Sequence, residues 1–312
     1  MSIVRLTDSI TGPSFNAYRD IQDIFHTPKD VDSIAQLPAE ILLLIDSGYS
    51  CTTVTPILKG RPLQSAIRRL DVGGKLLTNY LTRLLSLRHY DMRNDTYIVN
   101  EMKESACYVA LDFKGDLEKT WKGTRGERRD DYVGGGGIAK DYVLPDFHAR
   151  PMGIVRDYDP TATSRARKLA AAASNEDILT LRNERFTVPE LLFNPSDIGM
   201  QQPGLADLVM QSLSVLPIGL WPGLLANVVV VGGNSLFEGF IQRLKQEIVL
   251  RVPDDCVVRV ARPADPITST WSGAANFSKH EHVHRLAVTK QEYEEHGAQV
   301  IARKFAVGLG AD

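Results

Sequence analysis

The stretch ILLLIDSGYSCTTVTP, residues 41–56, decides how the rest of the chain is interpreted. An apolar run, Ile41 to Ile45, leads into Asp46-Ser47-Gly48, and a β-branched run at 52–55 follows directly. This pattern predicts a β-hairpin with one carboxylate at its tip. The small residues at the turn let the backbone approach a bulky anion, and Asp46 would hold a cation against it. An ordinary core hairpin with an aspartate in its turn has the same pattern, so the interpretation depends on other motifs.

Composition excludes several classes of protein. The chain has 312 residues, of which 43% are apolar and 24% charged, and its net charge of −2 argues against a general nucleic-acid-binding surface. The three cysteines are scattered without CxxC spacing, which argues against a disulfide framework or zinc site and favours a reducing compartment. No apolar run approaches the roughly 20 residues of a membrane span, and the N-terminus lacks a signal-peptide core. We therefore expect a soluble intracellular protein.

A second glycine-containing turn, Asp71-Val72-Gly73-Gly74, precedes a predicted helix. Apolar residues recur on one face of that helix at positions 76, 77, 80, 81, 84 and 85. Backbone amides at the start of such a helix can face a ligand. The stretch is not a P-loop, because Leu76 follows Lys75 where serine or threonine is required. A plain turn into a helix is the alternative interpretation.

A third turn follows the buried-strand run NVVVV at 227–231. Gly232-Gly233-Asn234-Ser235 comes next, and then a helix whose apolar face comprises Phe237, Phe240, Ile241, Leu244 and Ile248. A strand, a Gly-Gly turn and a helix in succession bring backbone against a nucleotide in many α/β proteins. The pattern is weak when it occurs alone.

Four other segments carry expectations. Residues 94–113 favour a helix in which Lys103 and Glu104 form a solvated pair. Residues 114–141, with glycines at 134–137, favour a flexible surface insertion, or alternatively an element that folds on contact with a partner. Two prolines predict an irregular packed segment at 183–199, and Val288 to Phe305 predicts one amphipathic helix.

The three turns, in this order, resemble those of the actin superfamily. The similarity runs from about Ile41 to Phe305 and includes KESACYVALDF (103–113), ERFTVPELLFNPSDIGM (184–200), VVVVGGNSLFEGF (228–240), STWSG (269–273) and VTKQEYEEHGAQVIARKF (288–305). The resemblance implies an α/β actin-like fold, the ribonuclease-H-like ATPase fold that actins share with hexokinase and heat-shock chaperones. It further implies a first-lobe remnant and loop at 1–40, the second lobe at 41–277, and helices at 278–312 that return to the first lobe.

Several shorter stretches resemble the sixth class of nuclear actin-related proteins, namely DSGYS with Tyr49, DVGGKLLTN, YVLPDF and NPSDIG. That class implies a subunit of the SWR-type chromatin remodeller, which exchanges a core histone for its Z-type variant and so regulates transcription. The implied partners are the remodeller ATPase and a small zinc-finger subunit, and through them nucleosomes and the variant histone. The implied location is the nucleus, and the cytoplasm is also possible for this class. The class implies neither membrane binding nor a free homo-oligomer.

The resemblance also implies a nucleotide site for ATP or ADP with Mg²⁺, held for structural purposes only. Asp46, Ser47 and Gly48 match the second phosphate-binding hairpin of actins, and Asp46 matches the carboxylate that faces the metal through water. The other matches are Lys103 and Glu104 beside adenine and ribose, Gly232, Gly233 and Phe237 in the adenosine loop, and Gly73 and Gly74 beside the ribose.

Three departures from the actin pattern bear on catalysis. Tyr49 stands where actins have a second acidic residue near the metal, Thr53 where a histidine helps to position water, and Ile267 where a lysine lies close to adenine. Hydrolysis needs a correctly held metal and an oriented water. We therefore expect a scaffold that is not an enzyme. The alternatives are an ATPase, a sugar-kinase-like phosphotransferase and a filament-forming cytoskeletal protein.

One part of the actin pattern has no match in this sequence. Nothing before Ile41 matches the first phosphate hairpin, and the surroundings of Gln22 do not match those of the water-orienting glutamine of actins. The expectation is a fold that is incomplete at its N-terminus, with one lobe whole and the other partial. A sheet edge and apolar surface would then be exposed, and the nucleotide would be absent if half of its cleft is missing.

Overall fold

The computed structural model describes residues 41–88, 90–120, 137–146, 150–159, 176–254, 256–279, 283 and 287–306. The first-lobe remnant expected at 1–40 lies outside the described residues, as do Phe147 of the YVLPDF stretch and residues 307–312. The predicted division into a second lobe at 41–277 and returning helices at 278–312 therefore stays a prediction.

Alternating apolar residues build the first hairpin. Strands β1 (Ile41–Ser47) and β2 (Thr52–Leu58) pair antiparallel, and Asp46 lies directly opposite Thr53. Every second residue from Leu43 to Ser47 is buried, as expected for a strand with one covered face. The predicted hairpin is confirmed.

The hairpin forms the middle of a six-stranded mixed sheet. Strand β8 (Val228–Val231) pairs parallel with β1, and its four valines are all buried. The strand order is β3-β2-β1-β8-β9, where β3 is Arg61–Pro62 and β9 is Val260–Ala261, and β4 (Arg68–Leu70) also pairs with β2. The parallel pairing places the turn after β8 beside the turn after β1, although 187 residues separate Ser47 from Asn234.

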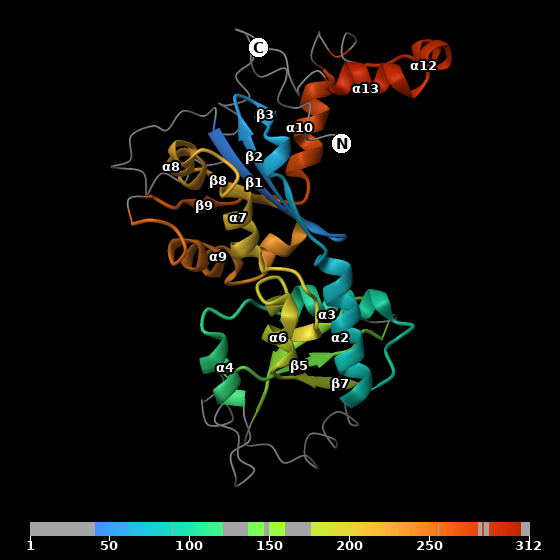
Figure 1. Ribbon diagram of the computed structural model, residues 1–312. Coiled ribbons are helices and arrows are strands. Elements are labelled where there is room, and N and C mark those ends of the chain that lie inside the picture. The colour runs from blue at the N-terminus through green and yellow to red at the C-terminus, as the bar shows by residue number, and fades with distance from the viewer. Residues whose placement is uncertain are drawn as a thin grey trace.

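Helices cover this sheet. Helix α7 (Leu205–Leu213) contacts β2 and β4, α8 (Trp221–Leu225) contacts β1, and α9 (Phe240–Val249) contacts β9. Figure 1 shows these helices together with the sheet in the upper part of the molecule. The apolar face predicted for α9 is confirmed at Phe240, Leu244 and Ile248, which are all buried. Helix α10 (Ser269–Ser278) follows the last strand.

A second group of elements lies in the lower part of Figure 1. It contains α2 (Gly74–Arg88), α3 (Thr96–Ala106), α4 (Phe113–Thr120), α6 (Glu184–Glu190) and a three-stranded antiparallel sheet. The order of that sheet is β6-β5-β7, with β5 at Lys140–Val143, β6 at Ile154–Asp157 and β7 at Ile178–Leu181. Helix α2 packs against α3 and α6.

The two groups are joined by the segment after α3. The Val109 amide donates to the Glu238 carbonyl at 2.8 Å, and Arg243 of α9 forms an ion pair at 2.8 Å with Glu190 of α6. Mixed and antiparallel sheets covered by helices confirm the α/β class. No helix of the described chain combines the length and apolar character needed to cross a bilayer.

Some predicted elements differ from the observed ones. The ends of the insertion expected at 114–141 are ordered, because α4 extends to Thr120 and β5 begins at Lys140, while residues 121–136 lie outside the described chain. The irregular segment expected at 183–199 contains helix α6 and a 3₁₀ helix at Pro195–Ile198. Proline at 189 is accepted in α6 because the Arg185 carbonyl, which loses its helical partner, accepts from the Tyr108 amide at 2.9 Å.

The C-terminal helix expected at 288–305 is two helices. Helix α12 (Lys290–His296) begins with a capping box between Thr289 and Glu292, and α13 is Ala298–Ala306. Gly297 separates them with a φ of +60°, which lies in the left-handed region and interrupts a right-handed helix. The prediction of a single helix was wrong for that reason.

Candidate nucleotide site

Three turns meet at one place, each at the end of a different strand. They are the turn after β1 at 48–51, the turn before α2 at 71–74, and the turn after β8 at 232–236. The Gly74 amide donates to the Gly48 carbonyl at 3.0 Å, and the Lys75 amide to the Tyr49 carbonyl at 2.8 Å. The Asn234 side chain donates to the same Gly48 carbonyl at 2.9 Å. The Gly48 carbonyl therefore accepts hydrogen bonds from both of the other turns.

Two glycines allow this close meeting of backbone with backbone. A Cβ on Gly73 would lie 2.6 Å from the Cys51 nitrogen and 2.7 Å from the Tyr49 carbonyl oxygen. A Cβ on Gly232, whose φ is +91°, would lie 2.3 Å from the Ser47 carbonyl oxygen. Side chains do not fit at such distances, so glycine at these two positions lets the turns pack against each other.

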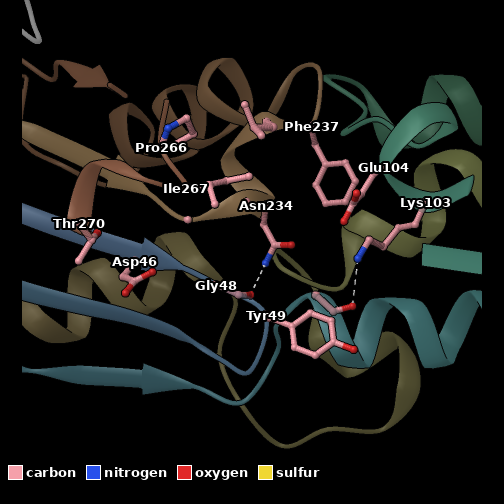
Figure 2. A pocket seen from close by; sticks show the side chains of 14 residues that line it. Asp46, Gly48, Tyr49, Lys103, Glu104, Asn234, Phe237, Pro266, Ile267 and Thr270 are labelled. Carbon is pink, nitrogen blue, oxygen red and sulfur yellow. Dashed lines mark hydrogen bonds between the residues drawn. The ribbon is translucent and has the colours of Figure 1, made fainter. Parts of the chain in front are cut away.

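A cavity of about 490 Å³ opens over the turns, within the size range of small-molecule sites. Eight of the ten residues proposed from the sequence line it together: Asp46, Gly48, Gly74, Lys103, Glu104, Gly232, Gly233 and Phe237. Figure 2 shows Asp46 toward one end and Lys103, Glu104 and Phe237 toward the other. Ser47 and Gly73 are not among the lining residues.

The Ser47 hydroxyl is engaged within the protein. It is completely buried and lies 3.0 Å from the Thr52 hydroxyl, which in turn donates to the Val72 carbonyl at 2.9 Å. The Asn234 amide nitrogen donates to Ser47 Oγ at 3.1 Å. Ser47 thus links the three turns and does not present its hydroxyl to the cavity.

Lys103 does not form the solvated pair that its sequence context favours. It is almost fully buried, and its ammonium donates to Asn100 Oδ1 at 2.8 Å, Thr78 Oγ1 at 3.0 Å and the Gly74 carbonyl at 3.3 Å. Burial lowers the pKa of Lys103, and the nearby Glu104 carboxylate offsets only part of this effect. Its fixed position beside Gly74 connects helix α3 to the second turn.

Asp46 places a carboxylate at the end of the cavity opposite Lys103. Burial raises the pKa of Asp46, and no donor within the described chain reaches its carboxylate. Its cross-strand neighbour is Thr53, which offers no second negative charge. Among the described residues no group of three or more potential metal ligands comes together. This donor set fits a Mg²⁺ ion held by one carboxylate through water, with a bound phosphate supplying further oxygens.

The rest of the lining was not proposed as binding from the sequence. Tyr49 and Ile267 stood out only as departures from the actin pattern, and both lie at the cavity. Asn234, Leu236, Pro266 and Thr270 were missed. The GGNS motif was the available signal for Asn234. The resemblance to actins placed Ile267 near adenine, but no local pattern marked Pro266 or Thr270 as lining residues.

The lining as a whole fits a nucleotide. Apolar side chains of Leu236, Phe237, Pro266 and Ile267 suit a planar base, and Glu104 and Asn234 offer acceptors beside them. A Cβ on Gly74 would lie 3.2 Å from the Tyr49 ring and 3.4 Å from both Asn234 Oδ1 and Lys103 Nζ, so glycine keeps this part of the wall open. The geometry offers a base end, a polar middle and a carboxylate end.

A mixed sheet with this hairpin, these three turns and a cavity between them defines a protein of the actin type. Residues 10–306 match the model of the actin family, and the chain belongs to that family.

Among its relatives, the chain is 74% identical over 302 residues to actin-related protein 6 of Neurospora crassa, covering 96% of this chain and 66% of the relative. It is 52% identical over 310 residues to actin-like protein arp6 of Emericella nidulans, covering 96% and 64%. It is 38% identical over 262 residues to actin-related protein 6 of Drosophila melanogaster, covering 84% and 62%. The resemblance to the sixth class is confirmed. The chain spans just under two thirds of the length of these relatives.

Proposed function

We propose that this actin-family chain is a non-catalytic scaffold subunit of a nuclear SWR-type chromatin-remodelling complex. The complex exchanges a core histone for its Z-type variant and so regulates transcription. Two things support the proposal: the similarity to relatives named actin-related protein 6, and the class-specific stretches around Tyr49 and residues 194–199. The proposed partners are the remodeller ATPase and a small zinc-finger subunit, and the proposed location is the nucleus.

One observation favours a scaffold over an enzyme. The cavity keeps its glycine turns and Lys103, but the two residues that would complete a hydrolytic centre beside Asp46 are Tyr49 and Thr53. Neither side chain supplies the second metal-side carboxylate or the basic nitrogen that positions an attacking water. A site that binds without turning over its ligand follows from this combination.

ATP or ADP would then act as a structural ligand. The apolar residues at one end would hold the base, the three turns would line the sugar and phosphates, and Asp46 would face Mg²⁺ through water. The metal would neutralise phosphate charge. Because residues from both parts of the molecule line the cavity, a ligand between them would stabilise their arrangement by mass action.

The test is to isolate the tagged full chain from nuclei and identify what accompanies it. The remodeller ATPase, the zinc-finger subunit and the variant histone should co-purify, and tagged conventional actin is the matched control. Nucleotide released from the denatured complex is identified by chromatography, and phosphate release by the isolated chain should equal that of buffer. Isolation without remodeller subunits would overturn the proposal.

The two alternatives predict other results in the same preparation. An ATPase or phosphotransferase would release or transfer phosphate above background. A filament-forming protein would sediment in ATP and magnesium, and would do so more strongly as its concentration rises.

A further inference from the structure

Asn234 is the side chain on which the three turns converge. It is 4% exposed, it lies at the cavity wall, and its Nδ2 donates both to Ser47 Oγ at 3.1 Å and to the Gly48 carbonyl at 2.9 Å. An asparagine amide has a donating and an accepting end, and which of them faces the cavity decides what the cavity recognises.

The hydrogen-bond network determines that orientation. The Val72 carbonyl can only accept, so the single proton of the Thr52 hydroxyl is donated to it. Thr52 must then accept from Ser47, whose Oγ is left to accept from Asn234. The Gly48 carbonyl can also only accept. Both partners therefore require the amide nitrogen, and a flipped amide would place two acceptors face to face.

The amide oxygen is consequently turned to the other side. Figure 2 shows it pointing away from Gly48, toward Glu104 and Lys103. Asn234 Oδ1 and Lys103 Nζ each lie 3.4 Å from the place a Gly74 Cβ would take, but the three protons of Lys103 are already directed to Asn100, Thr78 and the Gly74 carbonyl. Within the described chain no donor takes Asn234 Oδ1. It is an open acceptor.

We infer that Asn234 Oδ1 accepts a hydrogen bond from a ribose hydroxyl of the bound nucleotide, and that Asn234 is a specificity-determining residue for ribonucleotides. This inference rests on the proposed nucleotide site. The Glu104 carboxylate on the same wall is also an acceptor, and the protons of the nearby Lys103 ammonium are directed to protein acceptors, so this part of the wall offers open acceptors that suit hydroxyl donors. Phe237 and Leu236 beyond it offer the apolar surface that suits the base, which leaves the sugar opposite Asn234.

The experiment measures how the full chain discriminates ribose from deoxyribose. Calorimetry gives the affinities of ADP, 2′-deoxy-ADP and 3′-deoxy-ADP for the native chain and for Asn234→Ala. Loss of one neutral hydrogen bond corresponds to a preference of about 3- to 10-fold. The native chain should show this preference over at least one deoxy analogue, and in Asn234→Ala that preference should fall to about 1. A residue that only braces the turns would weaken all three ligands equally.

A matched control is Asn227→Ala. The Asn227 side chain also ties backbone together, since its Nδ2 donates to the Ile41 carbonyl at 2.8 Å, but it does not line the cavity. This variant should keep the ribose preference of the native chain. If Asn234→Ala does not fold, Asn234→Ser is measured instead, because a serine hydroxyl can still donate to the turn while it removes the oxygen that faces the cavity.

The outcomes separate the inference from the function on which it rests. If ADP binds and the ribose preference is absent, or survives in Asn234→Ala or Asn234→Ser, the inference is overturned and the nucleotide site stands. If the native chain binds neither ADP nor its analogues, both are overturned. Loss of the preference in the Asn234 variants alone supports both.

Discussion

At the scale of single residues, Gly232 gives the sharpest prediction. Its φ of +91° is strained for any side chain, and a Cβ would meet the Ser47 carbonyl at 2.3 Å. Gly232→Ala should lower the free energy of unfolding by more than the roughly 1–3 kcal/mol of backbone strain alone, because the β1 turn must also move. Urea denaturation measures the loss.

The matched control for this prediction is Gly199→Ala. Gly199 has a similar φ of +80°, but nothing lies within 4 Å of the position its Cβ would take. This variant carries the strain without the clash, so its loss of stability should stay within the strain range. Equal losses in the two variants would show that the turns after β1 and β8 are not in tight contact at Gly232.

Cys107 predicts a pH dependence. Burial raises the pKa of its thiol to about 12, whereas an unfolded thiol titrates near 8.5. Above about pH 8.5 the unfolded chain therefore loses a proton that the folded chain keeps, and stability falls by about 1.4 kcal/mol for each pH unit on this account. Below that pH the two states bind the same number of protons at Cys107, and the contribution does not change.

Cys107→Ala isolates this contribution. The variant should be less stable than the native chain at pH 7, because a buried sulfur is lost. The difference in the free energy of unfolding between the two chains should be constant between pH 6 and 7.5. The gap should then shrink by about 1.4 kcal/mol by pH 9.5. Urea unfolding at each pH measures it, and a gap that stays constant to pH 9.5 would mean that the thiol is not held neutral.

Single residues also show where prediction from the sequence stops. Small-residue turns after strands identified the glycines, since their signal is local. The direction of the Ser47 hydroxyl and the role of Asn234 were not predicted, because each is set by a partner from a distant strand. The burial of Lys103 likewise follows from its contact with the Gly74 turn, 29 positions earlier in the chain.

At the scale of elements, the ion pair between α6 and α9 gives the next prediction. Glu190 is completely buried and Arg243 is 11% exposed, and the two meet at 2.8 Å. Arg243→Met would leave the Glu190 carboxylate buried without its charged partner, so we expect a loss of about 3–5 kcal/mol in the free energy of unfolding. Burial already raises the pKa of Glu190, so this loss should diminish at acid pH as the carboxyl takes up a proton.

Arg251→Met is the matched control, in the turn that follows α9. Arg251 pairs with Asp207 at 2.6 Å, but the two side chains are 32% and 52% exposed. Exposed pairs contribute about 1 kcal/mol or less, so this variant should be only slightly destabilised. If both variants lost the same amount, the α6–α9 contact would be no more than a surface pair.

Elements with regular periodicity were predictable. Helices α2 and α9 repeat apolar residues at helical intervals, while the hairpin and β8 were predicted from short apolar and β-branched runs bounded by turn residues. The elements that were predicted incorrectly depend on long-range contacts or on the conformation of a single residue. Helix α6 tolerates its proline because Tyr108 takes up the stranded carbonyl, and the last helix divides at Gly297 because of one positive φ. Neither effect has a periodic signal.

At the scale of the whole molecule, the cavity lies where the two groups of elements meet. Asp46 and Gly233 belong to the large sheet and its turns, while Lys103 belongs to α3 in the other group. A ligand that touches both would resist their separation without any turnover. The proposed structural nucleotide is therefore testable by stability alone, independently of partners.

Gly233→Ala provides that test. The nearest atom to a Cβ at this position is Ile267 Cδ1 at 4.0 Å, so the free chain should accept the methyl group with unchanged stability. If the ligand lies on the Gly233 backbone, however, the added methyl group occupies space that the ligand needs. ADP at about 100 times its dissociation constant should stabilise the native chain by about 2.7 kcal/mol. A tenfold loss of affinity would reduce this gain by about 1.4 kcal/mol in the variant.

Gly219→Ala separates ligand contact from the mere addition of a methyl group. Gly219 has nothing within 4 Å of its Cβ position and does not line the cavity, so its variant should keep the full ADP-induced gain. Thermal unfolding with and without ADP compares the three chains. A reduced gain in Gly233→Ala alone places the ligand on the turn after β8. An equal gain in all three would mean that ADP binds elsewhere, and the absence of any gain would mean that this chain holds its two groups of elements together without a nucleotide.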